Sequence, residues 1–269
     1  MKLELLISAV NADPKKLIEK MHVFSDAVLV NQNGTDSEED LSLNGWTVRV
    51  FNSSEKGVGK SRNRCIDKAE GEILLFSDDD IEYDAGYERL VISEFEKHPG
   101  ADALFFNLNV DESRRTYWNT DFKRVRIWNS GRYPAYSMAV RRDALIKSGV
   151  RYSLLFGGGA KYSCGEDSLF IRDCLKAGLK LYRTPVAIGS EALREGGEST
   201  WFKGYNEKFF FDRGVLFHFL YGKLAGVFGF RFVYMKRDVM CREIPWKQAL
   251  KILKSGIKEG KQIDAGKSH

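Results

Sequence analysis

Residues 55–80 read "EKGVGKSRNRCIDKAEGEILLFSDDD". A glycine-containing loop leads into a helical pattern that closes at Gly71, and the apolar run 73–76 then meets Ser77 and three aspartates. Three adjacent carboxylates at the end of a buried strand repel one another and are costly to desolvate unless a cation lies among them. The stretch therefore predicts a helix and then a buried strand, whose end is either a solvated turn or a place for a cation.

Short apolar runs occur at residues 3–10, 27–30, 48–51 and 73–76. Each is a continuous run and not an alternation of apolar and polar residues, which favours a mostly parallel sheet covered by helices on both faces. The connection 31–47 is polar, and we expect no more than a short helical turn in it. The sequence therefore predicts an α/β fold with ligands at the carboxyl ends of the strands.

The regular alternation of strands and helices ends after a strand predicted at 103–108, and a charged, aromatic segment follows. We therefore expect a second lobe to begin near Asp111. Within it, residues 165–178 read "GEDSLFIRDCLKAG", a helical pattern that places Glu166 and Asp167 in the first turn.

The composition limits the class of protein. The chain has 269 residues, 43% of them apolar, which is enough for a full core. Its formal charge of +5 is uneven, because residues 201–269 hold 14 Lys and Arg against 6 Asp and Glu, and the negative remainder argues against nucleic-acid binding. The four cysteines lack metal-binding spacing, the start does not resemble a signal peptide, and no long uninterrupted apolar stretch occurs, so we expect a cytoplasmic protein with reduced thiols.

A P-loop is one interpretation of residues 54–61, "SEKGVGKS", because they follow a strand, open a helix and precede an apolar strand that ends in Asp. The P-loop pattern, however, requires glycine five residues before Gly59, where this chain has Ser54. A P-loop-like NTPase therefore stays open beside a second interpretation. In that interpretation the aspartates ligate Mg²⁺ or Mn²⁺ together with the phosphates of a nucleotide diphosphate.

Four segments together resemble the family-2 glycosyltransferases of the GT-A fold, which are inverting enzymes that use nucleotide-diphospho sugars. They are "SAVN" (8–11), "VNQNGTDS" (30–37), residues 55–80 and "GEDSLFIRDCLKAG" (165–178), in the family's order. The resemblance implies a Rossmann-like GT-A domain followed by a tail. Its expected parts are a nucleotide-sugar-binding lobe (1–110), an acceptor-binding and catalytic lobe (111–200) and an aromatic, basic, mostly helical C-terminal region (201–269).

The resemblance also implies a metal-dependent hexosyl- or N-acetylhexosaminyl-transferase with Mn²⁺ or Mg²⁺ as cofactor. UDP is the expected nucleotide, and the acceptor would be a glycan or lipid-linked glycan, as in polysaccharide biosynthesis at a bacterial cell surface. Asp80 and Asp78 would ligate the metal, and Asp36 would contact the base. Lys60 and Arg62 would lie near the base or the diphosphate, although both could also belong to an ordinary solvated helix face. The nucleotide-sugar-binding residues implied in this way are Val10, Asn11, Asp13, Asn33, Asp36, Gly57, Lys60, Arg62, Asn63, Asp78 and Asp79.

An inverting transfer needs a base that takes the proton of the acceptor hydroxyl as it attacks the anomeric carbon. The family places this base in the Glu-Asp pair, so the resemblance makes Asp167 the base and Glu166 the second candidate. Acids also suit a helix N-terminus electrostatically, which is the plain structural alternative. The acceptor-binding candidates are Gly157, Gly158 and Gly159, which would let an acceptor approach the backbone closely.

Two departures from the family pattern affect the site. Many relatives carry a His after the strand that follows the Glu-Asp helix, as a further metal ligand, whereas residues 184–193 read "TPVAIGSEAL". His218 is the nearest later candidate, but it lies in an aromatic segment where we expect it to pack. The first strand also ends in "SAVNAD" in place of the commoner Pro-Thr-Tyr-Asn, which bears on Asn11 and Asp13.

The C-terminal region is the last open question, because residues 201–235 contain 13 aromatic residues. They either form helices that close over the second lobe or, with the basic residues Lys223, Arg231, Lys236 and Arg237, form an interfacial helix on anionic lipid. The second alternative would give peripheral contact with the inner face of a membrane. A transferase-like lobe that binds glycan without catalysis is the remaining alternative to an enzyme.

Overall fold

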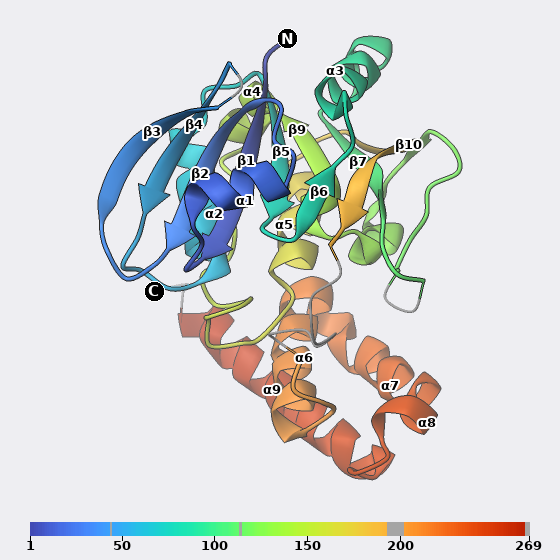
Figure 1. The fold of residues 1–269 in the computed structure, drawn as a ribbon. Coiled ribbons are helices and arrows are strands. Elements are labelled where there is room, and N and C mark those ends of the chain that lie inside the picture. Colours follow the sequence, from blue (N-terminus) through green and yellow to red (C-terminus); the bar gives the residue numbers. More distant parts are fainter. Residues whose placement is uncertain (44, 113–114, 193–201, 267–269) are drawn as a thin grey trace.

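The computed structural model describes residues 1–43, 45–112, 115–192 and 202–266. Its centre is a ten-stranded mixed sheet in the order β3-β4-β2-β1-β5-β9-β7-β10-β6, with β8 paired to β10 beside this path. Figure 1 shows this sheet above a separate layer of C-terminal helices. The strands are β1 (Leu3–Val10), β2 (Asp26–Gln32), β3 (Ser37–Leu43), β4 (Trp46–Asn52), β5 (Ile73–Asp78), β6 (Ile81–Tyr83), β7 (Ala103–Asn109), β8 (Lys123–Arg124), β9 (Met138–Arg141) and β10 (Leu181–Glu191).

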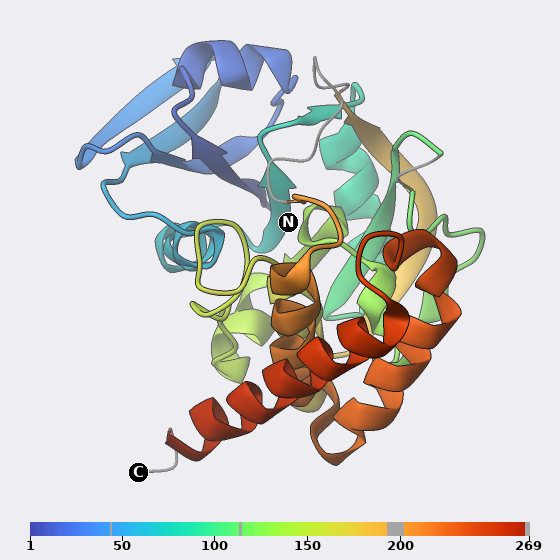
Figure 2. The same ribbon diagram turned by 90° about the horizontal axis from the view of Figure 1, so that it is seen from below.

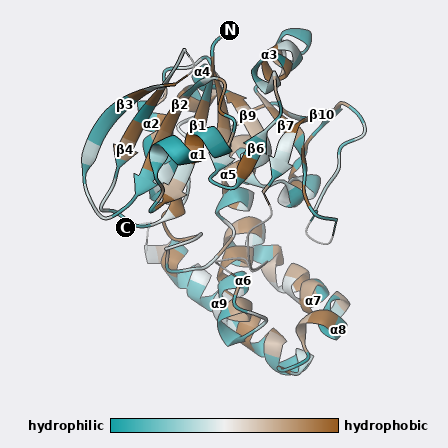
Figure 3. Ribbon diagram, viewed as in Figure 1, coloured by the Kyte–Doolittle hydropathy of each residue, from teal (hydrophilic) through white to brown (hydrophobic). Residues whose placement is uncertain are grey.

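Helices cover both faces of the sheet, as the continuous apolar runs predict. Leu5 of β1 belongs to a buried cluster with residues of α1 and α3, whereas the neighbouring Leu6 belongs to a second cluster with residues of α2, α4 and α5. Figure 3 shows hydrophobic colouring along these central strands. The helices are α1 (Pro14–Lys20), α2 (Val58–Lys68), α3 (Tyr87–Lys97), α4 (Arg142–Ser148), α5 (Glu166–Lys176), α6 (Glu207–Tyr221), α7 (Ala225–Met235), α8 (Arg237–Met240) and α9 (Trp246–Gly266), with short 3₁₀ helices η1 (Ile127–Arg132), η2 (Ala135–Ser137) and η3 (Gly222–Leu224).

The first part of the sheet is parallel. Strand β1 pairs in parallel with β2 and β5, and β2 pairs in parallel with β4. Strand β9 then enters antiparallel between β5 and β7, and β10 pairs in parallel with β7. The predicted α/β fold is confirmed, and strands from both expected lobes share one sheet.

The expectation for residues 31–47 was wrong, because β3 lies within that connection. Strand β3 pairs antiparallel with β4 along its whole length, from Ser37 opposite Asn52 to Leu43 opposite Trp46. It is an edge strand in which only Leu41 and Leu43 pack against the core, so most of it is held by backbone hydrogen bonds and little apolar pattern marks it in the sequence. Charged residues on such an edge also discourage pairing with other chains.

The C-terminal helices form their own packed layer below the sheet (Figures 1 and 2). Helices α6 and α9 approach closely because glycines lie at their contact: a Cβ on Gly214 would collide with the Leu253 carbonyl, and one on Gly256 with the Phe211 carbonyl. His218 packs in the same contact, against Gly260, with its Nε2 3.3 Å from Asp264. Among the helices of the described ranges, none combines the length and the apolarity that crossing a bilayer requires. The expected boundary at residues 200 and 201 lies outside the described residues.

Candidate active site

The predicted site residues gather where the parallel strands β1, β2, β4 and β5 end. Because these strands run in the same direction, their carboxyl ends meet at one edge of the sheet, which faces the C-terminal helices in Figure 1. Helix α2 follows β4, and helix α5 begins close to the same edge. The site therefore combines the ends of strands with the beginnings of two helices.

Arg62 of α2 is the centre of the site. Its side chain is 5% exposed, and its guanidinium donates to Oδ1 of Asp78 at 2.8 Å and to Oδ1 of Asp167 at 2.5 Å. Glu166 Oε1 lies 3.6 Å from the same guanidinium. One buried cation thus connects the end of β5 with the beginning of α5.

The charges of this cluster are unequal. Burial works to lower the pKa of Arg62, but the carboxylates of Asp167 and Asp78 outweigh it and hold that pKa well above its usual value. Burial and then the negative charge of Asp167 raise the pKa of Glu166 to about 7, against a partial offset by Arg62. Three acids thus surround one arginine, and Glu166 binds a proton far more readily than an ordinary carboxyl group does.

Asp167 is held in a defined orientation. Its Oδ1 accepts from Arg62, and its Oδ2 accepts from the Ala135 backbone N–H at 3.0 Å. It lies in the first turn of α5, as the sequence predicts. The helix-terminus alternative therefore accounts for part of its environment, but the bond to Arg62 ties it to the strand ends as well.

The three aspartates lie at the turn between β5 and β6. Asp78 ends β5, and the backbone carbonyl of Asp80 accepts from the Ala192 N–H at 2.7 Å. Tyr136 is partly buried near these residues, and desolvation and then the negative charge of Glu191, with smaller effects of Asp78 and Asp80, raise the pKa of its hydroxyl. Carboxylates from the end of β5, the following turn and β10 therefore lie near one tyrosine.

A second polar group lies at the ends of β2 and β4. Asn52 Oδ1 accepts from Asn31 Nδ2 at 3.1 Å and from Asn33 Nδ2 at 2.7 Å. Asp36 accepts from both the N–H and the hydroxyl of Ser54, and these bonds lower its pKa. The predicted residues Asn33 and Asp36 thus both form hydrogen bonds with residues at or just after the end of β4.

The residues predicted at the end of β1 have mixed environments. Val10 is 61% exposed, and Asn11 has a left-handed backbone, with φ of 51°. Asp13 caps α1 by accepting from the Lys16 N–H at 3.3 Å. Asp13 therefore has a structural task whether or not it contacts a nucleotide.

Two predicted residues of α2 are engaged within the protein. The amide of Asn63 donates to the Tyr152 carbonyl at 2.9 Å and accepts from its N–H at 2.8 Å, so it fastens α2 to the segment before the glycine run. Lys60 pairs with Glu55 at 2.7 Å at the protein surface. These contacts leave their predicted roles in nucleotide binding as proposals.

The glycine run 157–159 packs against the loop at Gly57. A Cβ on Gly159 would lie 3.1 Å from the backbone of Gly57, and one on Gly157 would lie 2.8 Å from the Glu166 carboxyl carbon. At Gly158 a Cβ would meet no atom within 4 Å. Close packing between two loops therefore accounts for Gly157 and Gly159, whereas Gly158 faces open space.

This packing also bears on the P-loop interpretation. The Gly57 N–H donates to the Gln32 side chain at 2.7 Å, and the Val58 N–H donates to the Gly158 carbonyl at 2.9 Å. A P-loop instead uses such backbone N–H groups to hold phosphates. The structure does not support a P-loop NTPase.

Three contributors to the site were not anticipated from the sequence: Ala135, Tyr136 and Tyr152. The Tyr152 ring is fully buried, stacks on Phe170 and lies 5.2 Å beneath the Arg62 guanidinium. A backbone donor such as that of Ala135 has no signature in the sequence. Tyr136 lies in the charged, aromatic segment that follows the strand at 103–108, whereas no sequence pattern marks Tyr152.

Comparisons with known proteins agree with this geometry. A model of the family described as Glycosyl transferase family 2 matches residues 17–152. No curated protein matches the sequence.

Two solved structures share the fold. S. aureus TarS 1–349 in complex with UDP-GlcNAc superimposes with a TM-score of 0.62 and 16% identity, over 90% of this chain and 74% of that chain. The mannosyltransferase PcManGT from Pyrobaculum calidifontis, in complex with GDP-Man and Mn²⁺, superimposes with a TM-score of 0.51 and 14% identity, over 97% of this chain and 75% of that chain. The family match covers half of the chain and includes the β4–α2–β5 unit, so the chain belongs to glycosyl transferase family 2 and has the GT-A fold.

Proposed function

We propose that this glycosyltransferase is an inverting enzyme that moves a hexose or N-acetylhexosamine from a UDP sugar to a glycan or lipid-linked glycan. The observation that carries the proposal is the bridge made by Arg62 between Asp78 and Asp167. Asp78 lies at the strand ends, where ligands bind in such sheets, and Asp167 lies at the start of α5. A single arginine side chain contacts both acids. Synthesis of a polysaccharide at a bacterial cell surface is the setting that we propose for this reaction.

Asp167 is our candidate for the base. Its bonds to Arg62 and to the Ala135 N–H fix its orientation, and its side chain remains 23% exposed, so an acceptor hydroxyl has a path to it. Glu166 is the second candidate, because its pKa of about 7 suits proton transfer near neutral pH. Gly158, with open space around its Cα, is where we place the approach of the acceptor.

The donor would lie between the strand ends and the loop at Gly57. We propose that Asp36 and Asn33 contact the nucleobase of the donor. Arg62 and Lys60 would lie near its diphosphate. A hollow of about 250 Å³ beside Gly57 and Gly159 is lined by Lys56, Lys60 and Lys161, which favours anionic groups in this region. The fuller set of proposed donor contacts adds Val10, Asn11, Asp13, Gly57, Asn63, Asp78 and Asp79.

The acids of the site also fit a divalent cation, Mn²⁺ or Mg²⁺, held by Asp78 and Asp80. Carboxylate oxygens are the ligands such ions prefer, and the cluster around Arg62 contains more acids than bases. Within the ranges that the structure describes, no group of three His, Cys, Asp or Glu side chains forms a complete metal site. Mg²⁺ is usually held by one or two carboxylates together with substrate phosphates, and this is the arrangement that we propose. When bound, it would offset charge on the departing diphosphate.

The Asp167→Asn variant tests the proposal. We expect it to bind UDP like the wild type and to lose transfer to acceptor by about 10²–10⁴-fold, because a positioned base contributes about that much. An acid that only favours the helix N-terminus would instead contribute about 0.3–1 kcal/mol of stability. Glu166→Gln is the matched control: if that variant is inactive while Asp167→Asn is active, the two roles are exchanged, and if both remain active the proposed base is wrong. An intact protein that binds glycan but transfers no sugar from any nucleotide sugar would favour the non-catalytic alternative.

A further inference from the structure

Large apolar side chains are concentrated on one exposed surface of the C-terminal helices. In the described parts of the chain 19 large apolar side chains are exposed, and 8 of them lie between residues 221 and 239. We call this the α7 surface; its members are Tyr221, Leu224, Val227, Phe228, Phe230, Tyr234, Met235 and Val239. Nearly half of the exposed apolar side chains thus come from a small fraction of the chain.

The side of α7 that is buried explains why the large residues face outward. Its buried positions are Ala225, Gly229 and Val233, which recur every four residues and form a narrow stripe. Gly229 allows close packing there, because a Cβ would lie 2.5 Å from the Leu253 side chain of α9, which would then have to move. Small residues therefore face the protein and large apolar residues face solvent, the reverse of an ordinary surface helix. Such a surface indicates a partner.

The charge of the same segment indicates what kind of partner this is. Residues 222–237 contain four basic residues and no Asp or Glu. Lys223, Arg231 and Lys236 are exposed, while Arg237 lies over the Tyr234 ring at 4.5 Å and pairs with Asp238 at 3.7 Å. Exposed aromatic and aliphatic groups beside lysine and arginine complement an apolar boundary that carries negative charge, which is the chemistry of an anionic lipid surface.

We propose that the α7 surface docks on an anionic lipid bilayer with α7 lying in the plane of the interface. The helix has 11 residues, so it is about 16 Å long, roughly half the thickness of the hydrocarbon core. It therefore lies on the bilayer and does not cross it. This inference deepens the proposed function, because it would bring a lipid-linked acceptor to the enzyme, but its observations are independent of the catalytic acids.

The docking surface is physically connected to the proposed site. Helix α6 precedes α7, and its Asp212 accepts from both the N–H and the hydroxyl of Ser163, at 2.9 Å each. Ser163 lies three residues before Glu166, at the end of the loop that holds the glycine run. Leu216 of α6 also packs against Gly165, the cap of α5. Docking through α7 would therefore hold the catalytic loop at a fixed distance from the lipid surface.

Flotation with lipid vesicles tests the proposal on the full chain. Wild-type protein should float with vesicles of phosphatidylglycerol and phosphatidylcholine at low salt, and much less with phosphatidylcholine alone. Combined Leu224→Gln, Val227→Gln and Met235→Gln should lower the partition coefficient at least about tenfold, since it removes three exposed apolar groups without touching the core. Arg231→Glu with Lys236→Glu should remove the preference for anionic lipid.

Matched controls use exposed residues elsewhere in the fold. Leu90→Gln with Ile146→Gln removes two apolar groups that are 42% and 41% exposed, and Lys20→Glu with Lys147→Glu reverses two exposed charges; both variants should float like the wild type. Asp167→Asn should also float normally, so failure of docking and failure of catalysis are distinguished. Recovery of the wild type only in the soluble fraction, or equal flotation of the Gln variant, would overturn the proposal. A dimer in sedimentation that the Gln variant dissociates would also overturn it and assign the surface to a second copy.

Discussion

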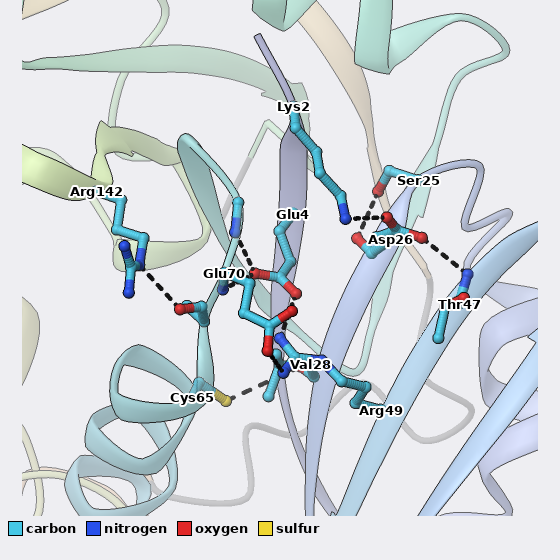
Figure 4. Close-up of polar contacts among 12 residues, drawn as sticks. Lys2, Glu4, Ser25, Asp26, Val28, Thr47, Arg49, Cys65, Glu70 and Arg142 are labelled. Carbon is cyan, nitrogen blue, oxygen red and sulfur yellow. Dashed lines mark hydrogen bonds and ion pairs between the residues drawn. The ribbon is translucent and has the colours of Figure 1, made fainter.

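Two arginines bind carboxylates at opposite ends of the sheet, and they differ in how many acids surround each guanidinium. Arg49 donates to Glu4 and Glu70, each at 2.7 Å, near the amino ends of the strands (Figure 4). Glu4 is 3% exposed, and its second oxygen accepts from the backbone N–H groups of Glu70 and Gly71. Both carboxylates thus contact the guanidinium directly, and only Glu4 of the two acids is buried.

The Arg62 cluster at the other end of the sheet has one more acid around its arginine, and none of these acids is as exposed as Glu70. Its single guanidinium faces Asp78, Asp167 and Glu166, and all three acids are partly buried. Negative charge in excess of positive charge is unfavourable unless a proton or a cation is added. We therefore expect the Arg49 network to serve stability and the Arg62 cluster to receive a ligand.

The largest expected effect concerns the Arg49 network. Arg49→Gln leaves the buried Glu4 carboxylate without its cation, so we expect a loss of about 3–5 kcal/mol in the free energy of unfolding. The rate of transfer per folded molecule should not change, because the network lies away from the proposed site. Urea titration and a transfer assay below the unfolding transition measure the two quantities. A large drop in rate without loss of stability would contradict the division between the two ends.

The reciprocal change is Arg62→Gln, which we expect to lower the rate of transfer about 10²-fold. It removes the group that orients Asp167, and a small misplacement of a reacting group lowers the rate by about that factor. Arg62→Lys is the matched variant. It keeps the charge, but one ammonium does not reproduce the two-sided fork between Asp78 and Asp167, so recovery should be only partial. Full activity of Arg62→Gln would show that the cluster is another structural network.

The pKa of Glu166 gives a pH-dependent prediction. This pKa is raised to about 7 in the folded protein, so the folded state binds the proton more tightly than the unfolded state does. The protonated side chain therefore contributes to the free energy of unfolding, and this contribution is fully present below the ordinary pKa of about 4.5. It is lost as the pH rises through about 7. Glu166→Gln should therefore gain stability relative to the wild type as the pH rises from about 4.5 to 7, by about 1–3 kcal/mol. Thermal unfolding across this range, with exposed Glu39→Gln as control, measures the difference; a difference that does not vary with pH would contradict the assignment.

Local patterns in the sequence were sufficient for much of the fold. Continuous apolar runs predicted β1, β2, β4 and β5, and the helical pattern that starts at Glu166 predicted α5, because burial on two faces and helical periodicity are local properties. Strand β3 escaped prediction for the opposite reason. As an exposed edge strand it is held by backbone hydrogen bonds to β4, and these leave no mark on side-chain composition.

The site itself was predictable residue by residue but not as an arrangement. The motifs indicated Arg62, Asp78 and Asp167 separately, yet Arg62 and Asp167 are 105 positions apart, and nothing in either segment predicts that they form an ion pair. Glycines 157 and 159 show a related limit. Gly159 packs against Gly57, and Gly157 packs against Val58 and Glu166, which becomes visible only when these segments are placed side by side.

The smallest expected effect tests whether the acids at the end of β5, beside the Arg62 cluster, hold a cation. If Asp78 and Asp80 share a divalent ion with substrate phosphates, Mn²⁺ should strengthen UDP binding to the wild type by about tenfold or more, and Asp80→Ala should bind UDP equally with and without the ion. Asp40→Ala, which removes an exposed acid from β3, is the control and should keep the full effect of Mn²⁺. Calorimetry with Mn²⁺ or with EDTA gives both affinities. The same UDP affinity for the wild type in the two conditions would show that Arg62 and a protonated Glu166 suffice to balance the cluster, and the contrast with the Arg49 network would then be one of protonation and not of metal binding.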